Sequence, residues 1–228
     1  MATRAALFDI DGTLVDTNHL HVTTWWEAFH QAGHTVRMSA IHRAVGLGSG
    51  DLIAHLLGDE RDRDQDAEII AAHTTLYGTY LDRLPAFDGA GDLLRSLADR
   101  GWRIVLATSA GEDELAALRR AIDADDVIAD DVMSGTAGGQ GVAGGKRGPD
   151  PVHRALDLAG VPAERAVFVG DTVWDMEAAS RAGVRAVALL SGGIPRAALE
   201  STGAREVYED ATDLLAQLDT SLFADLED

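Results

Sequence analysis

The hydrophobic and polar positions of this 228-residue chain change their spacing several times along the sequence. Short apolar runs, typical of strands buried on both faces of a sheet, occupy residues 5–8, 102–107, 166–169 and 186–189. Apolar residues that recur every three or four positions, the period of a helix, occur in residues 112–120, 151–159 and 173–182. Because strands and helices alternate, the pattern predicts an α/β fold, with a Rossmann-like, doubly wound parallel sheet covered by helices on both faces.

One long stretch departs from this alternation. Between residues 17 and 85 the period stays helical, as in Val22, Trp26 and Phe29, and no convincing strand occurs. Trp26 is expected to lie in the core of this segment, and the glycines of residues 46–50 to interrupt its helices. We therefore predict a small all-helical domain over residues 17–85, inserted into a core domain of residues 1–16 and 86–228.

Polar side chains follow the predicted strands at the points where the strands end. Asp9 and Asp11 follow the first run, and Gly12 gives the backbone the freedom to aim both carboxylates at one place. Ligands bind outside the carboxyl ends of the strands in parallel α/β sheets, so polar groups from later segments can converge there. These groups are Thr108 and Ser109, Lys146 in a glycine-rich loop, and Asp171 and Asp175.

Electrostatics constrains what such a site contains. If Asp9, Asp11 and Asp171 came within about 4 Å of one another, each pair would repel by roughly 4 kcal/mol at an effective dielectric constant near 20. A small hard dication such as Mg²⁺ would relieve this repulsion and would also accept a phosphate oxygen as a ligand. Lys146 is the only lysine of the chain, and its compact ammonium can approach both a phosphate and a crowded carboxylate.

Four motifs in this order resemble those of the haloacid dehalogenase superfamily, most closely its phosphatase-like branch with a small helical cap. They are Asp9-x-Asp11-Gly12-Thr13, Thr108-Ser109, Lys146, and Gly170-Asp171-Thr172 with Asp175. The resemblance spans nearly the whole chain, and it makes the inserted helical domain the expected cap. The branch includes phosphoglycolate phosphatases and β-phosphoglucomutases, and the run from Gly170 to Asp175 fits the former group well.

The resemblance implies a phosphoric monoester hydrolase that forms an aspartyl-phosphate. Asp9 attacks phosphorus, and Asp11 protonates the leaving oxygen and then activates water; Thr108 and Lys146 complete the catalytic set. The implied magnesium ligands are the carboxylates of Asp9 and Asp171 and the backbone carbonyl of Asp11, with Asp175 in support. The implied phosphate-binding residues are Gly12, Thr108, Ser109 and Lys146. The partner is a small phosphorylated metabolite, either a sugar phosphate or a phosphoglycolate-like compound.

Two alternatives stay open. A sugar phosphomutase similar to β-phosphoglucomutase shares the pattern of Asp16, Thr17, His21 and Trp25. Against it, Gly170 stands where the mutase has a glutamate, and residues 46–50 lack the arginine that grips a second phosphate. A non-catalytic binding module with the same fold is the other alternative, although such relatives are expected to lose an acid first, and this chain keeps both Asp9 and Asp11.

The start of the predicted cap supplies candidate substrate contacts. His21 and Trp25 lie just after the hinge that joins cap and core, where they can either line the pocket or pack in the cap. Arg43 can grip a substrate anion or simply be an exposed helical arginine, and Gly46 belongs to the cap loop of residues 46–50. We expect specificity to reside in these cap residues and rate in the core motifs.

Composition restricts the partners. The 19 basic and 38 acidic residues give a formal net charge of −19, which repels nucleic acids and anionic lipid surfaces. The absence of cysteine excludes disulfides and thiol catalysis. No run of 18 apolar residues occurs, and the N-terminus leads directly into the first strand without room for a signal sequence. We therefore expect a cytoplasmic monomer or homodimer that binds neither nucleic acid nor membrane.

Overall fold

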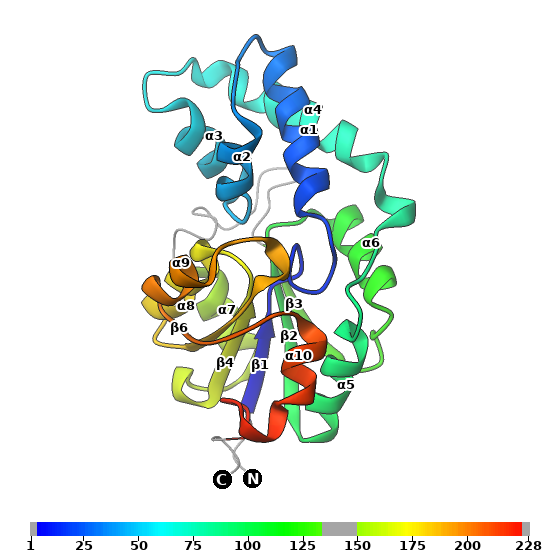
Figure 1. Cartoon of the computed structure of the whole chain (residues 1–228). Helices are drawn as coiled ribbons and strands as arrows, with labels where there is room; N and C mark the ends of the chain where they lie inside the picture. The colour runs from blue at the N-terminus through cyan, green and yellow to red at the C-terminus, as the bar shows by residue number, and fades with distance from the viewer. Residues whose placement is uncertain (1–3, 134–149, 225–228) are drawn as a thin grey trace.

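The computed structural model describes residues 4–133 and 150–224, and these form a parallel six-stranded sheet with helices on both faces (Figure 1). The order of the strands across the sheet is β3-β2-β1-β4-β5-β6, and all neighbouring pairs are parallel. The strands are β1 (Arg4–Phe8), β2 (Trp102–Thr108), β3 (Ile128–Met133), β4 (Ala166–Gly170), β5 (Arg185–Leu189) and β6 (Ala204–Tyr208). The predicted doubly wound α/β fold is confirmed.

Each face of the sheet is covered by its own set of helices. The side chains of β1 alternate, so Ala6 and Phe8 belong to one buried cluster while Ala5 and Leu7 belong to the other. The first cluster packs against α5 (Ala90–Asp99), α6 (Glu112–Ile122) and α10 (Ala211–Ala216). The second packs against α7 (Asp150–Ala159), α8 (Val173–Arg181) and α9 (Arg196–Ser201). Burial on both faces explains why the central strands are continuously apolar.

The four predicted strands and the three predicted helices of the sheet layer are confirmed, with ends that differ by at most two residues. Two further strands, β3 and β6, were not predicted, and they lie at the two edges of the sheet. The edge position explains the miss, because such strands carry exposed or half-buried charged residues, such as Asp130 and Asp131 in β3 and Arg205 in β6. These charges interrupt the apolar run on which the predictions relied.

The segment between residues 17 and 85 contains helices and the loops that connect them, but no strand, as expected. It contains α1 (Asn18–Gln31), α2 (Met38–Ala44), α3 (Ser49–Leu57) and α4 (Asp66–Gly78), and two short 3₁₀ turns at Arg63–Gln65 and Leu81–Arg83. These inserted helices share a third hydrophobic cluster, which includes Trp25 and Phe29. Trp26 does not belong to it: the side chain is 39% exposed and stacks on His30, so its expected core position is wrong.

The inserted helices lie above the carboxyl end of the sheet (Figure 1). The chain leaves β1 toward β2 and β3 on one side and later adds β4, β5 and β6 on the other. The carboxyl end of β1 is therefore the switch point of the sheet, where open α/β folds bind ligands. None of the helices in the described part of the chain has the length and apolar character needed to cross a membrane.

Candidate active site at the carboxyl end of the sheet

Three buried carboxylates meet at the switch point of the sheet. Asp9 follows β1, Asp171 follows β4, and Asp175 lies in the first turn of α8. One carboxylate oxygen from each lies within 4.8 Å of the others, and the three residues are at most 1% exposed. Charged groups are rarely buried so completely unless a cation or hydrogen bonds compensate them. The strand ends thus converge as the sequence predicts.

Neighbouring side chains fix these carboxylates. The Thr13 hydroxyl donates to one oxygen of Asp171 at 3.0 Å, and the Asn18 amide donates to the other at 2.8 Å. Asp175 Oδ2 accepts from the backbone N–H and the hydroxyl of Thr172, at 3.0 and 2.6 Å, in a capping box that starts α8. The same interactions that begin a helix therefore also aim a carboxylate at the switch point.

Glycines give the Asp171 carboxylate its space. A Cβ atom at Gly192 would lie 1.7 Å from Asp171 Oδ2, and one at Gly12 would lie 2.4 Å from the same atom. Gly12 also has a φ of +82°, which L side chains rarely adopt. The turn after β1 thus requires glycine both for its backbone conformation and for the close approach of a carboxylate that follows β4.

The donor set fits a hard divalent cation. Carboxylate oxygens are the ligands that Mg²⁺ and similar ions prefer, and three of them from Asp9, Asp171 and Asp175 converge in a buried position. Histidine and cysteine, which softer metals prefer, are absent from this group. The acidic cluster can therefore hold a divalent metal, and its chemistry favours oxygen-binding ions over zinc or copper.

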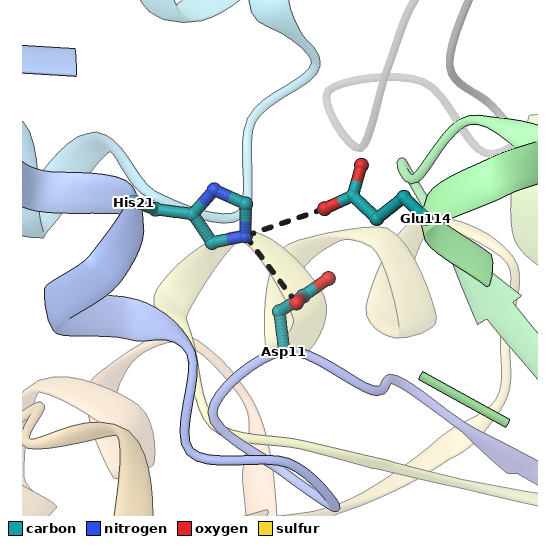
Figure 2. A group of neighbouring side chains, drawn as sticks. All are labelled: Asp11, His21 and Glu114. Atoms are coloured by element: carbon teal, nitrogen blue, oxygen red, sulfur yellow. Dashed lines mark hydrogen bonds and ion pairs between the residues drawn. The ribbon is translucent and has the colours of Figure 1, made fainter. Parts of the chain in front are cut away.

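Asp11 belongs to a different group. Its carboxylate does not join Asp9 and Asp171 but groups with His21 of α1 and Glu114 of α6 (Figure 2). The Thr17 hydroxyl donates to Asp11 Oδ1 at 2.7 Å, and His21 Nε2 lies 3.3 Å from the same oxygen. The expected cluster of the Asp9, Asp11 and Asp171 carboxylates is thus corrected. Thr17 and His21 thus hold Asp11 toward the inserted helices.

His21 connects the two acids of this second group. Its Nε2 atom lies 3.6 Å from Glu114 Oε1, its Nδ1 atom lies 3.3 Å from His73 Nε2, and its ring stacks on Tyr77 with centroids 4.1 Å apart. Burial favours the neutral imidazole, but the hydrogen bond with Asp11 and the charges of Asp11 and Glu114 outweigh it and raise the pKa of His21. The neighbouring acids therefore stabilise the protonated form of His21 more than water does for a free imidazole.

The pKa values of the other two titratable neighbours, Glu114 and His73, are shifted because these side chains are buried. Burial raises the pKa of Glu114 to about 7, although the charge of His21 opposes the shift. Burial and the adjacent His21 lower the pKa of His73 well below its ordinary value, so this imidazole is neutral at pH 7. Groups with pKa values displaced in this way gather at functional sites.

A pocket opens between the carboxyl end of the sheet and the inserted helices. The empty space among its lining residues is about 490 Å³ when the adjoining open solvent is included. Its lining residues are Asp11, His21, Trp25, Val45, Gly46, Leu47, Ser49, Leu52, His73, Ser109, Ala110 and Glu114. The structure therefore brings five of the sequence-predicted site residues, Asp11, His21, Trp25, Gly46 and Ser109, to one cavity beside the acidic cluster.

The remaining predicted residues have different positions. Thr108 is buried at the end of β2, and its hydroxyl accepts a hydrogen bond from the Ala110 N–H at 3.0 Å. Arg43 is exposed and does not line the pocket; its backbone carbonyl accepts a hydrogen bond from the Trp174 indole at 3.0 Å. Lys146 lies outside the described residues. The structure thus does not bring Arg43 to the cavity.

Three functional candidates were missed from the sequence. Glu114 stands early in the helix after Thr108 and Ser109, and that nearness to a motif was an available signal. Asn18 follows the hinge directly, but an asparagine there is also a common helix-start residue. His73 gave no signal, because its contact with His21 depends on how α4 packs against α1.

Comparisons with known proteins agree over most of the chain. The model of the haloacid dehalogenase-like hydrolases matches residues 3–183. A phosphoglycolate phosphatase of Rhodospirillum rubrum is 33% identical, with 92% of this chain and 89% of the relative covered. A hydrolase from Pseudomonas syringae has a TM-score of 0.87 at 32% identity, covering 95% of this chain and 98% of that one. CbbY from Rhodobacter sphaeroides, solved in complex with phosphate, has a TM-score of 0.76 at 27% identity, covering 95% and 99%.

Proposed function

Since this chain belongs to the haloacid dehalogenase-like hydrolases, we propose that it is a Mg²⁺-dependent phosphatase that cleaves a small phosphomonoester through an aspartyl-phosphate. The class of reaction, hydrolysis of a phosphoric monoester, follows from the family and its phosphatase relatives. One observation carries the mechanism: Asp9 and Asp11, only two residues apart, serve two separate groups of side chains. One acid is placed for attack and the other for proton transfer.

Asp9 is the proposed nucleophile. It lies at the end of β1 beside Asp171 and Asp175, and the whole residue is 1% exposed. Attack of its carboxylate on phosphorus forms an acyl phosphate and releases the alcohol, and water then cleaves the acyl phosphate and restores Asp9. Asp9, Asp171, Asp175 and the Asp11 carbonyl would hold a divalent ion, which would supply positive charge for the phosphoryl oxygens.

Asp11 is the proposed acid and base. Its carboxylate borders the pocket and is oriented by Thr17 and His21, so it can donate a proton to an oxygen that leaves into the cavity. After the alcohol departs, the same carboxylate can take a proton from the attacking water. The His21 ring lies beside Asp11, so the Asp11 carboxyl group has a hydrogen-bonding neighbour both before and after it transfers its proton.

The phosphoryl group is proposed to bind between the turn after β1 and the end of β2. Backbone N–H groups near Gly12 and Ser109, the Thr108 hydroxyl and the Lys146 ammonium are the proposed donors. Charge stabilisation by such preorganised donors dominates phosphoryl transfer, because the transition state spreads negative charge over the phosphoryl oxygens. The phosphate complex of the relative CbbY supports a phosphate site in this fold.

We also propose that residues 17–85 act as a cap on the core of residues 1–16 and 86–228. Cap side chains His21 and Trp25, together with Gly46, line the pocket opposite the core, where they meet the leaving group. A sugar phosphomutase is the weaker alternative: Arg43, the cap arginine nearest the loop of residues 46–50, does not line the pocket, and the relative from Rhodospirillum rubrum is a phosphatase.

The test is phosphate release from a panel of phosphomonoesters, measured with Mg²⁺ and again with excess EDTA. The panel includes sugar phosphates, phosphoglycolate and p-nitrophenyl phosphate, and conversion of β-glucose 1-phosphate is followed separately. We expect Mg²⁺-dependent release that falls more than about a thousandfold in Asp9→Asn. Full activity of Asp9→Asn would exclude the aspartyl-phosphate, isomerisation without release would favour the mutase, and binding without turnover would favour a non-catalytic module.

A further inference from the structure

Glu114 occupies the pocket from the side of the core, opposite the cap. It stands in the first turn of α6, and helical side chains lie back over the preceding turn, which places its carboxylate toward the end of β2. Figure 2 shows this carboxylate facing His21, with Asp11 beneath them. Ser109 and Ala110, which directly precede α6, line the same cavity. Glu114 is therefore held at the pocket by the motif that ends β2.

The proposed phosphoryl chemistry does not use Glu114. Its carboxylate is absent from the group of Asp9, Asp171 and Asp175, where phosphorus is attacked. In the pocket its carboxylate lies 3.6 Å from His21 Nε2 and within 4.8 Å of an Asp11 carboxylate oxygen. Glu114 thus faces the part of the pocket that the leaving group enters, next to the acid that protonates it.

The charge of this part of the pocket favours one class of leaving group. The described residues that line the pocket include two carboxylic acids, Asp11 and Glu114, and neither an arginine nor a lysine. Two histidines also line the pocket, but His21 Nε2 already contacts both acids, at 3.3 Å from Asp11 and 3.6 Å from Glu114. An anionic leaving group would therefore meet two acidic side chains, with neither an arginine nor a lysine among the described lining residues to bind it.

The remaining walls combine hydrogen-bonding and apolar surface. Trp25, Val45, Leu47 and Leu52 provide apolar lining from the cap, whereas Ser109 and Glu114 provide oxygens from the core. A sugar or polyol presents both kinds of surface, since its hydroxyls donate hydrogen bonds and its C–H groups pack on apolar side chains. A carboxylate accepts such hydrogen bonds in its ionised form and both donates and accepts in its neutral form.

We propose that Glu114 is a specificity-determining residue, whose carboxylate binds hydroxyl groups of an uncharged sugar or polyol leaving group and disfavours leaving groups that carry a carboxylate or a second phosphate. The inference rests on the proposed function, because a leaving group exists only if the chain cleaves a phosphomonoester. It narrows the substrate from small phosphomonoesters in general to phosphate esters of neutral polyhydroxy compounds.

The test compares kcat/KM for three esters at pH 8 with Mg²⁺. Glucose 6-phosphate has a neutral hydroxylated leaving group, phosphoglycolate has an anionic one, and p-nitrophenyl phosphate reports the core chemistry. The variant Glu114→Gln keeps the shape and removes the charge. Glu112→Gln is the matched control, because Glu112 lies in the same first turn of α6 but is exposed and does not line the pocket.

We expect the wild type to prefer glucose 6-phosphate over phosphoglycolate, and Glu114→Gln to reduce that preference by at least about tenfold, equivalent to about 1.4 kcal/mol. Glu112→Gln should keep the wild-type preference. A wild-type preference for phosphoglycolate, an equal loss on all three esters, or hydrolysis of p-nitrophenyl phosphate alone would overturn the role of Glu114 while leaving a phosphatase in place. Absence of hydrolysis of every ester would instead overturn the proposed function.

Discussion

Asp9 and Asp11 are separated by one residue, yet their carboxylates have different neighbours. Asp9 still follows the direction of β1 and meets the acids that follow β4, whereas Asp11 lies in the turn that leads to the inserted helices. Thr17 and His21, which come after that turn, hold the Asp11 carboxylate away from the buried acids. A single turn thereby separates nucleophilic attack from proton transfer in the proposed mechanism.

The residues that form the motifs could be identified from the sequence, but the side chains that contact them could not. The positions of Asp9, Asp171 and Asp175 follow from where strands end, because parallel strands end at one edge of a sheet. The contacts of Glu114 and His73 with His21 depend on how helices far apart in sequence pack. No local pattern encodes that packing, which is why the acid pair around His21 was not foreseen.

Asn18 offers a test of how the buried acids are oriented. Its amide donates to Asp171 Oδ2 at 2.8 Å and to the Gly192 carbonyl at 3.3 Å, so it orients a proposed metal ligand without binding the metal itself. Removal of such a partner commonly weakens metal affinity by about 10–100-fold. We expect Asn18→Ala to raise the Mg²⁺ concentration for half-maximal activity by at least about tenfold.

The control for Asn18→Ala is Thr23→Ala on the same helix. Thr23 is exposed, and its hydroxyl donates to the His19 carbonyl at 2.9 Å, away from the buried acids. Thr23→Ala should keep the Mg²⁺ dependence of the wild type. Equal Mg²⁺ dependence in Asn18→Ala and the wild type would show that Thr13 alone orients Asp171.

Among the helices and strands, the predictions were correct for strands that are buried on both faces of the sheet. Central strands such as β1 and β4 are buried on both faces and form apolar runs, while β3 and β6 at the edges carry charged residues and were missed. The inserted helices were expected as a group, but the pattern did not predict where α1, α2, α3 and α4 end or where the two 3₁₀ turns lie. Where a helix stops depends on caps and packing, which leave a weaker signal than periodicity.

The loop between α2 and α3 brings the inserted helices into close contact with the segments that follow β4 and β5. A Cβ atom at Gly46 would lie 2.9 Å from Thr172 Oγ1, and His42 Nε2 donates to the Gly192 carbonyl at 2.9 Å. Gly46 also has a φ of +98°. Because Thr172 caps α8 through Asp175, a side chain at Gly46 would push on the residue that orients an acid of the site.

We therefore expect Gly46→Ala to lower kcat/KM by about tenfold or more, since a small misplacement at an active site can cost about a hundredfold. Gly58→Ala is a matched control, because Gly58 has a φ of +80° but no other atom lies within 4 Å of the place that its Cβ would occupy. Both variants should lose about 1 kcal/mol of unfolding free energy from the strained backbone. Only Gly46→Ala should lose activity. Similar kcat/KM values in the two variants would contradict the idea that the contact between Gly46 and Thr172 supports catalysis.

For the whole molecule, the excess of acidic residues is the dominant electrostatic feature. The chain has 38 acidic and 19 basic residues, so even complete pairing of the basic residues leaves a formal net charge of −19. The ion pairs of the described surface, such as Arg95–Asp126 and Arg196–Glu209, are largely exposed, and exposed pairs contribute only about 0–1 kcal/mol each. Repulsion among like charges therefore outweighs the surface pairs.

This balance predicts that salt stabilises the fold. Raising NaCl from about 0.05 to about 0.5 M shortens the screening length to roughly 4 Å, which weakens long-range repulsion more than contacts between paired groups. A gain of about 1 kcal/mol raises the Tm of a chain of this size by about 2–4 °C, so we expect a rise of at least that size in thermal unfolding near neutral pH. The same titration at about pH 5 should give a smaller rise, because protonation reduces the negative charge. A Tm that falls with NaCl would mean that ion pairs, and not net repulsion, govern the stability of the molecule.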